Sequence, residues 1–290
     1  MSVPFYYSHK ASLFAGFPDQ YLALASPIFA YWSLSLFFHY LDISSWKWLE
    51  KHRIHESSEV KARNIATRSQ VVWAVLLQQV IQTLLGLMWL SDGPKTTNHT
   101  QRMQDIMMKL CPFLRWGVGG AKTEEVIHDL VYFVYWWGIP GFQFLTAMYG
   151  SVPMLSLRYS ARCTYAFFLF RFFIDTWQYF LHRLMHINKF LYRHFHSWHH
   201  RLYVPYAFGS LYNHPVEGFV LDTLGAALAE TLTGMSTRQA TLLFTFSTFK
   251  TVDDHCGYNL PFDPLQFFGN NADYHDIHHQ ACIAFFLTYI

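Results

Sequence analysis

Two stretches of this chain run the length of a membrane-spanning helix without one Asp, Glu, Lys or Arg: residues 20–41 and residues 69–91. A bilayer core of about 30 Å requires about 20 apolar helical residues, so both are long enough to cross it. Residues 130–157 form a third such stretch, interrupted by glycines and prolines, and residues 163–181 a fourth that contains one Arg and one Asp. We therefore expect an all-α integral membrane protein with about four transmembrane helices, because no segment sustains the alternating pattern of a strand.

The composition agrees with a membrane protein and excludes other classes. Charged residues make up 14% of the chain, against about 25% in ordinary soluble domains. Aromatic residues reach 19%, which suits anchoring at a membrane interface. The net charge of +2 gives no reason to expect a nucleic-acid partner. The four cysteines contain no CxxC pair, which argues against a disulfide framework and against a thiolate metal site.

Polar segments separate the apolar ones. Residues 42–68 and residues 92–129 read as polar connectors, and the second contains a glycosylation sequon at Asn98. Residues 216–250 are apolar but broken by charged side chains, so we expect a helical pair that dips into the membrane interface rather than two full spans.

Histidines are the unusual residue type, and 11 of the 17 fall between His182 and His279. They form one HxxxH box and two HxxHH boxes: His182-Arg-Leu-Met-His186, His196-Ser-Trp-His199-His200 and His275-Asp-Ile-His278-His279. Residues three and four apart share one face of a helix, with Cβ atoms about 5–6 Å apart. An HxxxH box therefore directs two imidazoles at one point, and an HxxHH box directs its first and last at one point. Eight imidazoles are about what two metal ions require, so we expect a dimetal site.

Three further histidines were weighed as ligands. His255 is a candidate for a ninth ligand, whereas His214 is as well explained as a hydrogen-bonded core residue, and His194 lies off the face of its box. Imidazole suits Zn, Cu, Fe and Ni alike. Structural zinc sites often use thiolates, and none of the three boxes contains a cysteine, although Cys256 lies beside His255.

Polar residues around the boxes are candidates for orienting the ligating imidazoles. Arg171, Asp175, Gln178 and His182 are spaced as one stripe along a helix. The stripe is explained either by a simple Arg171–Asp175 ion pair or by Asp175 and Gln178 acting as hydrogen-bond partners of a ligand histidine. Asp276, inside the third box, is a candidate for the same part.

The order of these boxes, with a histidine before Gly-Tyr between the second and third, resembles the fatty acid hydroxylase superfamily. Within it, longer strings resemble the sphingolipid C4-hydroxylases, and fungal ones most, rather than the sterol C4-methyl oxidases or C5-desaturases. The strings are residues 48–55, 78–86, 175–182, 213–217 and 268–279. The likeness extends from about Phe5 to Gln280.

The resemblance implies two iron ions and O2 at a site ligated by the eight box histidines, with His255 close by. It implies hydroxylation of a sphingoid base, sphinganine or its ceramide, at carbon 4 to the phytosphingosine form. Electrons would come from NADPH or NADH through a separate cytochrome b5 or its reductase. It also implies an N-terminal membrane hairpin with polar connectors in residues 1–129 and a catalytic domain in residues 130–290.

The resemblance also bears on location. It implies a multi-pass protein of the endoplasmic reticulum membrane. Four spans would place the histidines on the same side as Met1 and residues 92–129, and we expect that side to be the cytosol because the electron donors are cytosolic. Four spans would also put residues 42–68 on the opposite side; the positive-inside rule favours the cytosol for them, but it barely discriminates, because residues 42–68 hold six Lys and Arg and residues 92–129 hold five.

Two alternatives stay open from the sequence. A sterol C4-methyl oxidase or a lipid desaturase would use the same boxes. Family members continue past the third box, whereas here only residues 281–290 follow. We therefore also consider a truncated, inactive isoform that is stabilised by metal, in which a helix that would close the site is missing.

Overall fold

The structure, a computed structural model, describes residues 12–44, 46–89, 103–104, 108, 129–138, 174–233, 237–267 and 271–281. These residues form α-, 3-10 and π-helices and, within this described part, no sheet. In chain order the elements are α1 (Asp19–Ile43), α2 (Lys47–Glu50), α3 (Ser57–Arg63), α4 (Arg68–Trp89), η1 (Val134–Gly138), α9 (Ile174–Ile187), α10 (Lys189–His194), η2 (His196–Arg201), η3 (Ala207–Leu211), α11 (Pro215–Gly218), η4 (Phe219–Leu224), α12 (Gly225–Thr233), α13 (Thr237–Asp254), η5 (Pro264–Phe267) and α14 (Ala272–Ala281). The expected helical class is confirmed for the part described.

Helices α1 and α4 are long and apolar enough to cross a membrane, with 25 and 22 residues. Both carry large apolar side chains that face outward: Phe29 is 76% exposed, Trp73 70% and Met88 85%. Such a surface is costly in water and suits lipid. The other two expected spans, residues 130–157 and residues 163–181, lie largely outside the described residues.

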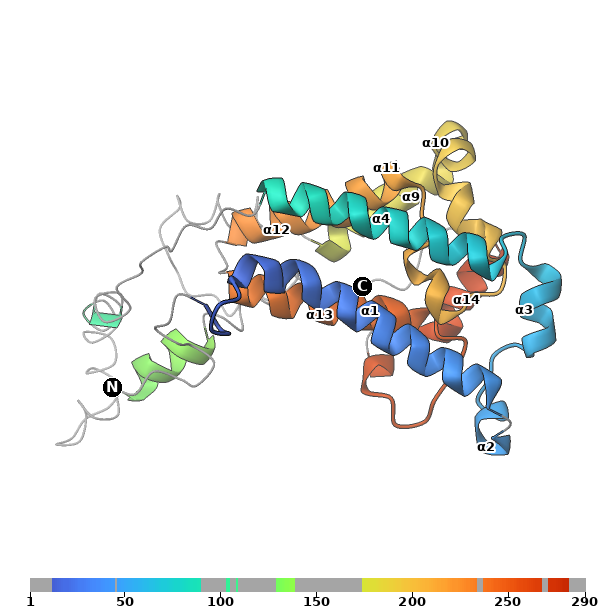
Figure 1. The fold of residues 1–290 in the computed structure, drawn as a ribbon, viewed down its shortest axis with the longest axis horizontal. Coiled ribbons are helices and arrows are strands. Elements are labelled where there is room, and N and C mark those ends of the chain that lie inside the picture. The colour runs from blue at the N-terminus through green and yellow to red at the C-terminus, as the bar shows by residue number, and fades with distance from the viewer. Residues whose placement is uncertain are drawn as a thin grey trace.

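The expected helical pair within residues 216–250 is present, as α12 and α13. Figure 1 shows α13 running beside α1 along most of its length. Two polar contacts join this pair of helices: Thr245 Oγ1 donates to Ser26 Oγ at 3.0 Å, and Arg238 pairs with Asp19 at 2.6 Å. Helix α13 thus packs along α1, and the expectation that the pair dips into the membrane interface stays a prediction.

The connector between α1 and α4 packs on the histidine-rich part of the chain. Asn64 donates to Val204 O at 2.8 Å, and Val204 N donates back to Asn64 Oδ1 at 2.7 Å. Ile65 N donates to Arg201 O at 2.9 Å, directly beyond the second histidine box. In Figure 1, α3 and α14 accordingly lie at the same end of the long helices.

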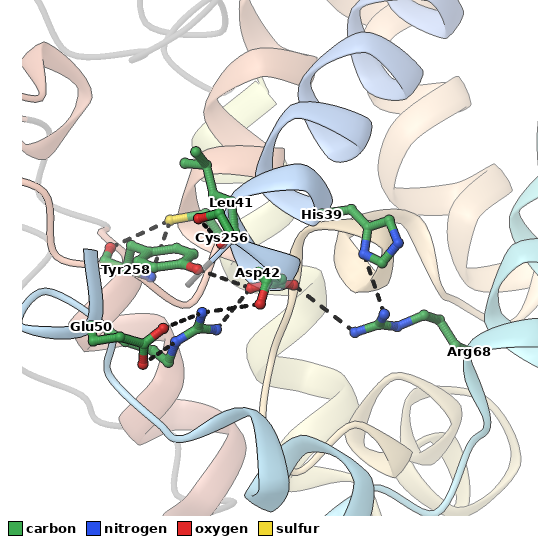
Figure 2. Close-up of polar contacts among 9 residues, drawn as sticks. His39, Leu41, Asp42, Glu50, Arg68, Cys256 and Tyr258 are labelled. Atoms are coloured by element: carbon green, nitrogen blue, oxygen red, sulfur yellow. Dashed lines mark hydrogen bonds and ion pairs between the residues drawn. The ribbon is translucent and has the colours of Figure 1, made fainter. Parts of the chain in front are cut away.

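A charged network fixes the end of α1 to the same region (Figure 2). The Asp42 carboxylate accepts from Arg53 Nη1 at 2.9 Å and from the Tyr258 hydroxyl at 3.1 Å. The Cys256 thiol, next to the ligand candidate His255, donates to Tyr258 O at 3.3 Å. Asp42 thus joins the connector to the loop that follows α13.

These contacts correct the expected topology. Four spans would put residues 42–68 and the histidines on opposite sides of the membrane, and that separation is wrong. Hydrogen bonds between the connector and the histidine region cannot form across a bilayer about 30 Å thick. The connector and the histidines share one end of the long helices, and α1 begins at the opposite end.

Candidate metal centre

All nine histidines expected as ligands gather in two compact groups. Within each group, the potential ligand nitrogens lie within 4.8 Å of one another. The first group consists of His182, His186, His196, His200 and His278, and the second of His199, His255, His275 and His279.

Four elements supply these side chains. Helix α9 carries the first box at its C-terminal end, η2 carries the second, α14 carries the third, and His255 follows the last residue of α13. Each HxxHH box gives its first and last histidine to one group and its middle histidine to the other. The two boxes do so in opposite senses, because η2 contributes its pair to the first group and α14 contributes its pair to the second.

The nitrogen spacing in the first group is that of ligands around a metal ion. Nε2 of His196 lies 2.9 Å from Nε2 of His186 and 3.0 Å from that of His200. Nε2 of His186 also lies 3.2 Å from those of His182 and His278. Two nitrogens about 2.0–2.1 Å from one metal, at angles between 90° and tetrahedral, are about 2.9–3.4 Å apart.

The second group shows the same spacing. Nε2 of His275 lies 2.9 Å from that of His255 and 3.1 Å from that of His279, and Nε2 of His255 lies 3.4 Å from that of His199. Hydrogen bonding does not explain either cluster, because a neutral imidazole has only one N–H. The donor sets therefore fit metal ions, one for each group.

Burial keeps these imidazoles in the form that binds metals. Removal from water lowers the pKa of His186 and His196 to about 3 and that of His199 to about 4, with neighbouring histidines adding to the shift for His186 and His199. The rings are thus neutral at physiological pH, and a neutral ring has a nitrogen lone pair available to a metal.

The other ring nitrogen of several histidines has an oxygen partner. His196 Nδ1 lies 2.6 Å from Glu217 Oε1, His199 Nδ1 lies 3.2 Å from Tyr212 O, and His255 Nδ1 lies 2.8 Å from Thr251 O. An Nδ1–H that donates to such an oxygen fixes the ring orientation and leaves Nε2 free for a metal. The Nε2 atoms are the ones that converge.

Glu217 is a site residue that the sequence analysis did not assign. It lies on α11, whose first residue is Pro215, and only 1% of it is exposed. Burial raises its pKa to about 7, while the nearby His199 and His214 oppose that shift. The available signal was a glutamate within the apolar stretch 216–250, since a carboxylate in such a place usually has a partner.

The other sequence candidates lie near the groups but have different contacts. Gln178 Nε2 donates to Asp222 Oδ1 at 3.3 Å, and Asp276 Oδ2 lies 3.0 Å from His55 Nε2. Neither contact involves one of the nine histidines, and the Asp175 side chain lies outside the described residues. The orienting roles expected for Asp175, Gln178 and Asp276 therefore stay predictions.

The two doubtful histidines belong to neither group. His214 Nδ1 accepts from Val216 N at 3.2 Å and so caps α11, and its ring lies against Phe195 and Trp198. His194 Nδ1 lies 2.9 Å from Phe190 O on α10. Both contacts agree with structural roles.

A helical chain with two candidate membrane helices and two buried histidine groups at one end defines a class of membrane-associated metal enzymes. Comparison with known proteins narrows this class. The family model for fatty acid hydroxylases matches residues 167–286, which include all nine histidines.

Relatives match over most of the chain. The sphingolipid C4-hydroxylase SUR2 of Saccharomyces cerevisiae is 48% identical over 273 residues, which cover 93% of this chain and 68% of that protein. Sphinganine C4-monooxygenase 2 of Arabidopsis thaliana is 38% identical over 263 residues, covering 90% and 79%. The very-long-chain aldehyde decarbonylase GL1-9 of Oryza sativa subsp. japonica is 35% identical over 263 residues, covering 90% and 80%. No solved structure matches. The chain belongs to the fatty acid hydroxylase family, and sphingolipid C4-hydroxylases are among its relatives.

Proposed function

We propose that this chain hydroxylates a sphingoid base, sphinganine or its ceramide, at carbon 4 to give the phytosphingosine form. The observation that carries the proposal is the gathering of nine neutral histidines into two groups with metal-like nitrogen spacing. The sphingolipid C4-hydroxylase and sphinganine C4-monooxygenase relatives supply the substrate class. The division into residues 1–129 and 130–290 remains part of the proposal, although connector contacts cross it.

The reaction consumes one C–H bond, O2, two electrons and two protons, and yields C–OH and water. Two iron ions, when bound, would supply the redox chemistry that activates O2 towards an unactivated C–H bond. Histidines with this neutral, converging arrangement suit iron, and zinc could not change oxidation state. Electrons would come from NADPH or NADH through cytochrome b5 or its reductase.

The protein's own part is to position and to exclude water. Nδ1 contacts fix the ring orientations of His196, His199 and His255, which leaves their Nε2 atoms directed at the two groups before substrate arrives. Most of the ligands are buried, including His196, His199 and His279. Exclusion of water protects a reactive centre from side reactions and strengthens electrostatic interactions within it.

We further propose an endoplasmic reticulum location with the histidine end in the cytosol. The connector, residues 42–68, then lies in the cytosol too, because it is bonded to the histidine region. It holds six Lys and Arg, so this orientation satisfies the positive-inside rule.

The test is expression of the chain in cells that lack phytosphingosine, with sphingoid bases analysed by mass spectrometry. A base that gains one oxygen at carbon 4 supports the proposal. Loss of two hydrogens would indicate a desaturase, and an oxidised sterol methyl group would indicate a sterol oxidase. A purified chain that binds only zinc and shows no turnover would indicate an inactive isoform. His199→Ala is expected to abolish the product, and His194→Ala, a matched histidine outside both groups, to retain it.

A further inference from the structure

A short segment of the connector, residues 52–55, contacts two parts of the chain that carry ligands of the second histidine group. One is the loop that follows α13 and begins with His255, and the other is α14. Asn259 N donates to His52 O at 2.8 Å, and Ile54 N donates to Gly257 O at 3.0 Å. Arg53 and Tyr258 form an antiparallel bridge between these bonds. The segment therefore pairs with the backbone just beyond His255.

This pairing stabilises the loop that begins where α13 ends. Helix α13 ends at Asp254, one residue before His255, and Gly257 turns the chain with φ of +78°. That backbone conformation favours glycine and is not maintained by helical hydrogen bonds. His255 N and Cys256 N still donate to Val252 O and Asp253 O, and residues 52–55 supply the partners of Gly257 O and Asn259 N beyond them.

The side chain of His55 reaches the other part, helix α14. Its Nε2 lies 3.0 Å from Asp276 Oδ2, and Gln280 Nε2 donates to the same carboxylate oxygen at 2.6 Å. Asp276 is only 6% exposed and stands next to His275 on the helix. A buried carboxylate without partners is costly, so this contact stabilises one position of α14.

The two histidine groups are supported differently. In the first group, the Glu217 carboxylate contacts Nδ1 of the ligand candidate His196 directly. In the second group, backbone carbonyl oxygens contact Nδ1 of His199 and of His255. The positions of the His275 and His279 rings depend on the position of α14, which carries them. Residues 52–55 contact both α14 and the loop after His255, and Asn259 of that loop also donates to Asp273 on α14.

We propose that residues 52–55 position the second histidine group and that His55 is a positioning residue that acts on it through Asp276. The connector between the two candidate membrane helices then helps to position ligands of the metal centre. The proposal rests on the metal centre of the proposed function and not on its substrate. It assigns to His55 a role in metal occupancy and no contact with substrate.

The expected effect is selective loss of one metal ion. Removing a residue that orients a metal ligand typically weakens metal binding about 10–100-fold. His55→Ala should weaken binding at the second group by that factor and leave the first group unchanged. At limiting iron, the purified chain should then hold one ion where the unsubstituted chain holds two.

The experiment is an anaerobic Fe2+ titration of the full chain in detergent, with bound metal measured by elemental analysis and metal–metal coupling by magnetic spectroscopy. His52→Ala is the matched control, because only its backbone oxygen contacts the loop; it should bind two coupled ions. His55→Gln, which can still donate to Asp276, should recover most of the second-site affinity.

Equal weakening of both ions in His55→Ala, or an unchanged second ion, would overturn the proposal. So would a His52→Ala chain that loses the second ion as His55→Ala does. An unsubstituted chain that binds no pair of iron ions would instead overturn the proposed function on which the inference depends. A chain that binds two coupled ions but makes no 4-hydroxylated base would leave the role of His55 standing.

Discussion

The contact between Glu217 and His196 allows a quantitative prediction about the first histidine group. Glu217→Gln keeps the size of the side chain and removes its charge. The contact is 2.6 Å long and the glutamate is 1% exposed, so little water can replace the lost partner. A charge-assisted bond of this length is about twice as strong as a neutral one.

The expected loss follows from that geometry. Partners that orient metal ligands contribute about 10–100-fold to metal affinity, which corresponds to about 1.4–2.8 kcal/mol. We therefore expect Glu217→Gln to bind the first ion about 10–100-fold more weakly, with the second ion unaffected. Glu217→Ala should lose at least as much, because His196 Nδ1 then has no side-chain acceptor there.

Anaerobic Fe2+ titration with a competing chelator measures this loss directly. Asp19→Asn serves as the control, because it also removes a paired carboxylate but lies at the start of α1, at the end of the long helices opposite both groups. Wild-type affinity in both Glu217 variants would refute the reasoning. Equal loss of both ions would show that Glu217 maintains the fold rather than one ligand.

Three further outcomes are expected. Asp42→Ala removes the carboxylate nearest to Arg53, whose side chain is 6% exposed and keeps Glu50 as a partner. It should lower the unfolding free energy by about 1–3 kcal/mol, seen as an earlier thermal transition; an unchanged transition would contradict the network. The metal-free chain should lose folding free energy as the pH falls from about 6.5 towards 3–4. Burial lowers the pKa of His186, His196 and His199 to about 3–4, so the unfolded chain takes up protons at a higher pH than the folded chain does. Acid titration followed by circular dichroism tests this. In sealed microsomes, a membrane-impermeant thiol reagent should label Ser58→Cys and not Ser12→Cys, and the reverse pattern would place the histidine end in the lumen.

The ligand set could be read from the sequence because its geometry is local. Spacings of three and four residues fix which face of a helix each imidazole occupies, whatever the helix packs against. The pairing of His182 and His186 on α9, and that of His275 and His279 on α14, follow from this rule. The pairing of His196 and His200 does not, because η2 is a 3-10 helix, in which residues three apart share a face. Which box shares a metal with which was not predictable, because it depends on packing between distant elements.

The residues that orient the ligand histidines, and the side of the membrane that the connector shares, could not be predicted for the same reason. Glu217 meets His196 across 21 residues, and His55 meets Asp276 across 221. No short-range pattern encodes such contacts. The expected separation of residues 42–68 from the histidines was wrong because it rested on counting four apolar stretches as crossings, whereas length and composition show only that a stretch is able to cross.

The long separation between the connector and its partners affects the order of events during synthesis. His55 leaves the ribosome 221 residues ahead of Asp276. At about 5–20 residues per second, translation takes about 10–40 s to supply that partner. During this interval Arg53 can pair with Asp42 and Glu50, but Tyr258 and the partners of residues 52–55 near residues 257–259 and Asp276 do not yet exist. Transient protection of this segment by a chaperone or by the membrane surface would therefore influence how much of the protein matures correctly.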